Sequence, residues 1–207
     1  MKKPLFLVVL LAVVATLSSF LFAEGGYQVG DKAADFKLKN VDGKLVSLAG
    51  NSAAKGYIVV FTCNTCPYAK AYEDRIIALH QKYAPQGYPV VAINPNDPQI
   101  APGDSYAEMQ KQASSKKYPF AYVFDESQEV ARTYGATRTP HVYVLQRTGA
   151  ADFKVAYIGA IDNNTEDAKA ATAKYVEQAL ADLMAGKAAT TSATKAVGCT
   201  IKWKKKA

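Results

Sequence analysis

Apolar and polar positions along the chain alternate in blocks that predict strands and helices in an α/β order. The continuous apolar runs at 57–61 and 88–93 are typical of strands that are covered on both faces. Between them, apolar residues recur at three- and four-residue steps from Ala69 to Tyr83, which predicts a helix with one buried face. Gly87 is expected to end that helix. The middle of the chain should therefore form a strand, a helix and a second strand in succession.

The flanking segments predict further elements. Period-two alternation at 35–39 and 45–48 predicts an N-terminal β-hairpin. Ser105 and Glu108 have the spacing of a capping box, which predicts a short inserted helix ending near Ser115. The remaining expected elements are a strand at 120–124, a short helix at 127–134, strands at 141–145 and 153–158, and a last helix that is capped by Asn164 or Thr165 and ends before Gly186.

The first 23 residues have the pattern of an export signal. Lys2 and Lys3 precede a run from Leu5 to Leu17 that is almost wholly apolar. We expect residues 1–23 to be a cleaved signal peptide, or else a membrane anchor, because the apolar stretch approaches the length of a bilayer span. Either outcome places the rest of the chain in an extracytoplasmic, oxidising space, periplasmic or secreted.

Length and composition predict one domain with additions. The chain has 207 residues, and its apolar fraction of 49% can supply a core. We expect the domain at 27–184 and a basic tail at 185–207, because four of the last six residues are lysines and the net charge is +7. No nucleic-acid motif accompanies this charge, so we expect no nucleic-acid partner, and we expect a monomer.

The tail carries apolar residues that an extended, solvated segment usually lacks. Val197, Ile201 and the single tryptophan, Trp203, predict that the tail docks onto the domain. Cys199 lies among them and makes the cysteine count three, an odd number. It is interpreted either as a third thiol brought to a redox site or as a buried, inert cysteine that anchors the tail. We prefer the inert anchor, because free cysteine is among the most buried residue types.

The candidate chemistry lies between the first central strand and its helix, where Cys63 and Cys66 form a CxxC motif. On the first turn of a helix, residues three apart are neighbours, so the two sulfurs can be joined or separated with little backbone movement. The free N–H groups and the positive dipole end of the helix favour a thiolate. Cys63 is expected to be the more acidic, attacking nucleophile, and Cys66 the resolving thiol.

The structural alternatives for this cysteine pair are half of a zinc site and a plain structural disulfide. Zinc needs about four ligands, and the chain offers only Cys199, His80 and His141 besides the pair. His80 lies at the edge of the predicted helix and is expected to be solvated. We therefore predict no metal site, and a redox pair is favoured because a CxxC beside a βαβ pattern is typical of a thioredoxin-like protein.

The order of elements, together with the CxxC and a distant Thr139-Pro140 before a strand, resembles the thioredoxin fold. More narrowly, residues 27–184 resemble the redoxin group, meaning the TlpA- and ResA-like thiol-disulfide oxidoreductases and the AhpC/TSA peroxiredoxins. The resemblance implies a central mixed sheet flanked by helices, with an N-terminal hairpin and a redoxin-type insertion. It also implies that Pro140 is cis and lies against the redox pair, and that Thr139 offers backbone groups to a bound substrate chain.

Three positions depart from the family pattern. Thr62 stands where relatives commonly have tryptophan, and the strand at 57–61 lacks the acidic residue that serves many relatives as a buried proton acceptor. The peroxiredoxin pattern of a proline and a threonine placed ahead of the cysteine is also missing, since Thr62 is directly adjacent to Cys63 and no proline lies between Gly56 and Cys63. This last departure weakens a peroxidase interpretation most.

The expected function is an extracytoplasmic thiol-disulfide oxidoreductase that exchanges the CxxC disulfide with protein thiols and needs no cofactor. A membrane electron donor is implied if the chain acts as a reductant. One alternative is a thiol peroxidase, in which Cys63 becomes a sulfenic acid that Cys66 or Cys199 resolves. Another is a Cu(I)-handling chaperone that holds the metal with two thiolates and His141.

Overall fold

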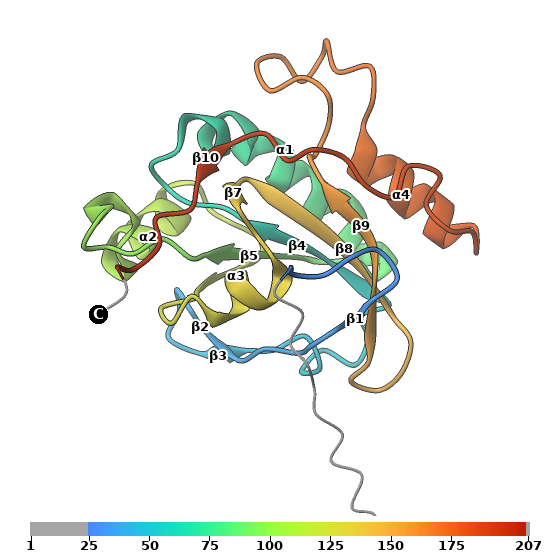
Figure 1. The fold of residues 1–207 in the computed structure, drawn as a ribbon, viewed down its shortest axis with the longest axis horizontal. Coiled ribbons are helices and arrows are strands. Elements are labelled where there is room, and N and C mark those ends of the chain that lie inside the picture. Colours follow the sequence, from blue (N-terminus) through green and yellow to red (C-terminus); the bar gives the residue numbers. More distant parts are fainter. Residues whose placement is uncertain (1–24, 206–207) are drawn as a thin grey trace, which may run out of the picture.

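The computed structural model describes residues 25–205 and has a mixed eight-stranded sheet at its centre, with helices on both faces (Figure 1). The order of strands across this sheet is β1-β9-β8-β4-β5-β6-β2-β3. The strands are β1 (Lys32–Ala33), β2 (Leu38–Asn40), β3 (Leu45–Val46), β4 (Gly56–Phe61), β5 (Val90–Asn94), β6 (Ala121–Phe124), β7 (Arg138–Thr139), β8 (His141–Arg147), β9 (Phe153–Gly159) and β10 (Cys199–Thr200). The helices are α1 (Pro67–Tyr83), α2 (Tyr106–Ser115), α3 (Glu129–Tyr134) and α4 (Tyr175–Met184), with short 3-10 turns at Ala84–Gln86 and Pro102–Asp104.

β4 divides the core into two halves. Every residue of this strand is buried, and its side chains alternate between the faces of the sheet. Ile58 and Val60 belong to the cluster that includes the apolar faces of α1 and α4. Val59 and Phe61 belong to the cluster that includes Tyr134 of α3. Burial on both faces explains why this strand appears in the sequence as a continuous apolar run.

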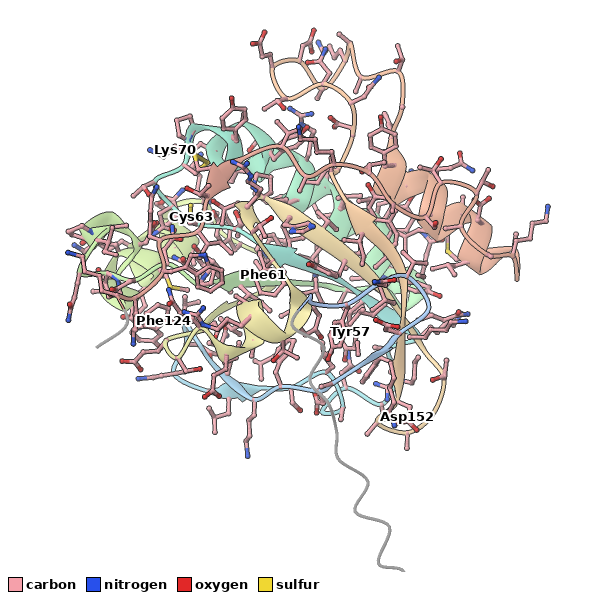
Figure 2. The ribbon with its side chains drawn as sticks, in the orientation of Figure 1. Tyr57, Phe61, Cys63, Lys70, Phe124 and Asp152 are labelled. Carbon is pink, nitrogen blue, oxygen red and sulfur yellow. A yellow bond between two sulfur atoms is a disulfide. The ribbon has the colours of Figure 1, made fainter. Side chains whose placement is uncertain are left out.

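The pairing of β4 determines which loops lie together. β4 runs parallel to β5 and antiparallel to β8. Because the carboxyl ends of parallel strands meet at one edge of a sheet, the loop after β4 and the loop after β5 lie side by side. Figure 2 shows Cys63 just beyond Phe61, at this end of β4, and Tyr57 toward the other end. The CxxC motif therefore faces residues of the loop that follows β5.

The thioredoxin-like fold predicted from the sequence is confirmed. β2 and β3 form the antiparallel N-terminal hairpin, and α2 is the inserted helix between β5 and β6. Ser105 caps α2 by accepting a hydrogen bond from the Glu108 amide at 3.4 Å. Gly135 ends α3 in the left-handed conformation with φ 74°.

The predicted start of the last helix is wrong. The helix begins at Tyr175, and residues 163–174 form loops instead. Asn164 bonds the amides of the residues two and three positions later through its side chain, a local turn that competes with helix formation. Arg75 of α1 holds the loop in place, because its guanidinium donates to the carbonyl oxygens of Asn164 and Thr165.

The interpretation of His80 as a solvated side chain is also wrong. His80 is half-buried, and its Nδ1 accepts a hydrogen bond from the Val90 amide at 3.2 Å. Burial lowers the pKa of this imidazole below its usual value. His80 therefore supports the junction between α1 and β5.

The predicted signal peptide or anchor at 1–23 lies outside the described residues. Within residues 25–205, no helix has both the length and the apolar character needed to cross a membrane.

Candidate active site

The CxxC motif forms the turn between β4 and α1. Cys66 is the N-cap of α1 in an extended conformation, and Pro67 occupies the first turn, where its missing N–H is not needed. Cys63 therefore lies three residues before the N-cap, just before the first turn of the helix. The end of β4 and the start of α1 together fix where both sulfurs lie.

Thr139, the residue before Pro140, lies directly against the cysteine pair. The peptide bond between Thr139 and Pro140 is cis, as the family resemblance implies. The Thr139 hydroxyl oxygen is 3.3 Å from Cys63 Sγ, and the Thr139 carbonyl oxygen is 3.1 Å from Cys66 Sγ. The structure thus brings together the four residues that the sequence singled out as the site, with fully buried Thr139 touching both sulfurs.

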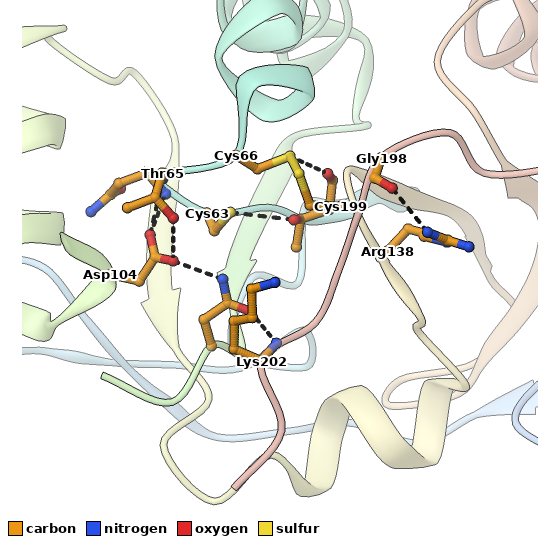
Figure 3. The surroundings of a disulfide bond; sticks show 11 residues. Cys63, Thr65, Cys66, Asp104, Arg138, Gly198, Cys199 and Lys202 are labelled. Carbon is orange, nitrogen blue, oxygen red and sulfur yellow. Dashed lines mark hydrogen bonds between the residues drawn. A yellow bond between two sulfur atoms is a disulfide. The ribbon is translucent and has the colours of Figure 1, made fainter. Parts of the chain in front are cut away.

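Cys199 forms a disulfide with Cys66 (Figure 3). The two Cα atoms are 6.0 Å apart, and 133 residues separate the cysteines in sequence. Cys63 is left as a free, buried thiol. The preferred interpretation of Cys199 as an inert anchor is therefore wrong, because a cysteine bonded to a member of the CxxC is a third sulfur of the same site.

The tail reaches the site by docking along the domain, as predicted. Ile201 is buried, and the Lys202 carbonyl accepts hydrogen bonds from the Asp97 amide at 2.9 Å and the Gln128 side chain at 2.8 Å. Trp203 is half-buried, with the Arg132 guanidinium 4.4 Å from its ring. Val197 is the exception among the predicted docking residues, because 43% of it is exposed.

Asp104 is a buried carboxylate of the site that the sequence analysis missed. Its oxygens accept hydrogen bonds from the amides of Asn64 (2.7 Å) and Thr65 (3.1 Å) and from the Thr65 hydroxyl (2.9 Å). The Asn96 side chain donates a further bond at 2.7 Å. Asp104 therefore fixes the two residues between the cysteines. Asp104 could have been predicted from the sequence, because parallel pairing of the two central strands places residues that follow β5 close to the CxxC.

The Cys63 thiol is less acidic than the sequence suggested. Burial raises its pKa above the usual value, and the negative charge of Asp104 raises it further. The hydrogen bond with the Thr139 hydroxyl acts in the opposite direction. With the tail in place, Cys63 is therefore held mainly as a thiol and not as the thiolate needed for attack.

We expect Thr139→Val to slow alkylation of Cys63 by iodoacetamide at neutral pH. Cys63 is the free cysteine when Cys66 is bonded to Cys199, and peptide mapping of the alkylated protein counts the adduct on this thiol alone. A hydrogen bond to a charged group contributes about 1.5–3 kcal/mol, so losing it should raise the pKa of Cys63 and slow the reaction by about tenfold. Thr137→Val, at an exposed position of the same segment, is the matched control. An unchanged pH profile of alkylation would contradict the role given to the hydroxyl.

His141 does not reach the sulfurs through any observed hydrogen bond. It is buried, its Nδ1 accepts from the Thr137 amide at 3.4 Å, and burial lowers its pKa to about 4. Among residues 25–205, no group of three or more histidine, cysteine or acidic side chains is placed to hold a metal ion. The copper alternative therefore has no ligand set in this part of the chain.

Known proteins resemble this chain in both sequence and fold. The AhpC/TSA family matches residues 29–156. The thiol-disulfide oxidoreductase ResA of Halalkalibacterium halodurans is 23% identical over 150 residues, which cover 72% of this chain and 81% of that protein. An uncharacterized conserved protein from Geobacillus kaustophilus has a TM-score of 0.79 and 36% identity, covering 87% of this chain and 94% of its own. A hypothetical protein from Sinorhizobium meliloti 1021 has a TM-score of 0.78 and 31% identity, covering 87% and 97%.

Proposed function

This chain belongs to the AhpC/TSA family and is a thioredoxin-like oxidoreductase, and on that premise we propose that its CxxC pair exchanges a disulfide with protein thiols outside the cytoplasm. One observation carries the proposal: Cys63 and Cys66 both lie within 3.3 Å of Thr139, beside a cis Pro140. A substrate chain laid along Thr139 would bring its own sulfur to either cysteine. The site thus combines a nucleophile, a resolving thiol and, from a distant segment of the chain, a backbone edge for substrate.

The exchange proceeds in two steps of thiolate attack. Cys63 loses its proton to solvent and attacks one sulfur of a substrate disulfide, which forms a mixed disulfide and releases one substrate thiolate. Cys66, which a dithiol donor has first freed by reducing the Cys66–Cys199 bond, loses its proton to solvent and attacks Cys63 Sγ, which forms the Cys63–Cys66 disulfide and releases the second substrate thiolate. The substrate is reduced by two electrons and the CxxC is oxidised by two, and the reverse sequence oxidises a substrate dithiol.

The direction of exchange follows from the reduction potential of the cysteine pair. A strongly negative potential supports a reductant, whereas a mild one supports an oxidase or isomerase. In an oxidising space, a reductant must itself be reduced again by a membrane electron donor. The proposed location depends on the export pattern of residues 1–23, and we expect a monomer without a cofactor. Equilibration of the protein with glutathione buffers measures the potential.

Single-cysteine chains test the assignment of the nucleophile. In a chain carrying Cys66→Ser and Cys199→Ser, only Cys63 remains, and its mixed disulfide with insulin should persist because no thiol resolves it. The matched chain carrying Cys63→Ser and Cys199→Ser retains only Cys66 and should accumulate far less adduct. Intact-protein mass spectrometry after acid quenching measures both. Equal trapping by the two chains would show that Cys63 is not the preferred nucleophile.

Thiol peroxidase activity is less well supported by the site. A peroxidatic cysteine reacts as its thiolate, whereas burial and then the charge of Asp104 raise the pKa of Cys63. Consumption of hydrogen peroxide by the reduced protein, at a rate comparable with its reduction of insulin, would favour the peroxidase instead.

A further inference from the structure

A short stretch of the tail, residues 195–200, crosses the active site as a strap. Before it, Thr194 is bonded to β9, since its amide donates to the Ile158 carbonyl at 2.9 Å. After it, Ile201 is buried in the core. Between these anchors, β10 pairs antiparallel with β7 (Figure 1), and Cys199 lies opposite Thr139. The strap therefore occupies the backbone edge of the residue that precedes the cis proline.

At Gly198 the strap lies so close to the Thr139 edge that no residue with a Cβ atom fits there. A Cβ atom on Gly198 would lie 2.3 Å from the Thr139 carbonyl oxygen. The Arg138 guanidinium donates to the Gly198 carbonyl at 3.2 Å and holds the strap on the other side. With the strap in place, Cys63 is only 6% exposed and Cys66 only 3%. A protein substrate cannot reach either sulfur until the strap leaves.

We propose that the strap is an internal substrate strand, which competes with external proteins for the Thr139 edge and is locked there by the Cys66–Cys199 disulfide. This inference rests on the proposed function. It also names the class of substrate: an extended segment with glycine directly before its cysteine, because the strap meets the edge with Gly198 and Cys199. Larger residues before the cysteine would collide with the Thr139 carbonyl.

The lock opens by a rearrangement that needs no external oxidant or reductant. The Cys63 thiol loses its proton to solvent, and the thiolate attacks Cys66 Sγ. The Cys66–Cys199 bond breaks, the Cys63–Cys66 bond forms, and the Cys199 thiolate that leaves takes up a proton. The closed protein, with Cys66–Cys199, and the open protein, with Cys63–Cys66, are thus isomers of the same oxidation state. The open isomer leaves the Thr139 edge free for a substrate dithiol.

Weakening the strap should improve access of protein substrates. A short tether gives a competing segment an effective concentration in the mM range, so releasing it should lower KM for insulin by about tenfold or more with little change in kcat. Gly198→Val releases the strap by collision with Thr139, and Cys199→Ser removes only the lock. Val197→Ala, at the exposed neighbouring position, is the control and should behave as the wild type. An unchanged KM in both Gly198→Val and Cys199→Ser would overturn the proposal.

A peptide supplied in trans tests occupancy of the edge without relying on activity. A fluorescein-labelled peptide with the sequence of residues 195–204, with serine for the cysteine, should bind a chain carrying both Gly198→Val and Cys199→Ser and leave the oxidised wild type unbound. The same peptide with valine for its glycine should bind neither chain. Fluorescence anisotropy measures both, and equal binding of the two peptides to the doubly substituted chain would overturn the proposal.

Different results would contradict the proposed function and the role of the strap. If insulin reduction proceeds without Cys63, the proposed function fails, whatever the peptide does. If insulin reduction depends on Cys63 but neither KM nor peptide binding responds to Gly198→Val, only the strap proposal fails.

Discussion

Replacing Cys63 by serine should abolish catalysed reduction of insulin, with a loss of at least about a hundredfold, because a serine hydroxyl is a weak nucleophile unless a base activates it. Cys66 is not expected to replace it when the donor has reduced the protein, because the Cys66 sulfur lies against the Thr139 carbonyl oxygen and is only 3% exposed. The rate of insulin precipitation with a dithiol donor, compared with the donor alone, measures the effect.

Cys199→Ser is the matched control for this substitution. It makes the same chemical change at a sulfur that attacks no substrate in the proposed exchange, so turnover should be retained or increased. Peptide mapping of the non-reduced Cys63→Ser protein should still show the Cys66–Cys199 bond, even at alkaline pH, because the thiolate that would break it is gone. Equal turnover by Cys63→Ser and Cys199→Ser would contradict the role of Cys63.

The parts of the fold that follow from local sequence could be predicted. The apolar run of β4, the capping box of α2 and the left-handed glycine after α3 each depend on a few neighbouring residues. The CxxC and the distant Thr139-Pro140 belong to the same category once the family pattern is recognised. These elements lie where the sequence analysis placed them.

The features that were missed depend on contacts between distant segments. The start of the last helix was predicted wrongly, because Arg75 holds the carbonyl oxygens of Asn164 and Thr165, about 90 positions away, in a loop. The bond between Cys66 and Cys199 spans 133 residues and leaves no periodic signal. The position of Cys63 near a helix N-terminus favours a thiolate, whereas burial and then the charge of Asp104 raise its pKa in the folded chain. A local sequence pattern cannot predict these contacts or this pKa shift, because each depends on segments that meet only in the folded chain.

Asp104→Asn should both destabilise the fold and make Cys63 more acidic. The carboxylate of Asp104 is fully buried and accepts hydrogen bonds from Asn64, Thr65 and Asn96. An asparagine would turn an NH2 group toward some of these donors, and an unsatisfied buried group costs about 1–3 kcal/mol. We expect a loss of about 2–3 kcal/mol, which for a chain of this size lowers Tm by roughly 5–10 °C.

Asp104→Asn should also make the Cys63 thiol more reactive. The negative charge of Asp104 helps to raise the pKa of Cys63, so removing it should shift the alkylation profile of this thiol to lower pH. At a fixed neutral pH, Cys63 should then react faster although the protein is less stable. A purely structural role for Asp104 predicts the loss of Tm without a shift of the profile, so the two measurements separate the electrostatic role from the structural one.

Asp97→Asn is the matched control for both effects. Asp97 lies in the same loop and is also buried, but its carboxylate bonds the local amide of Gln99 at 3.0 Å and none of the residues between the cysteines. Asp97→Asn should therefore leave the pH dependence of Cys63 alkylation unchanged, even if it lowers Tm. If Asp97→Asn and Asp104→Asn shift the profile equally, the charge of Asp104 has no special relation to Cys63, and burial alone accounts for the raised pKa.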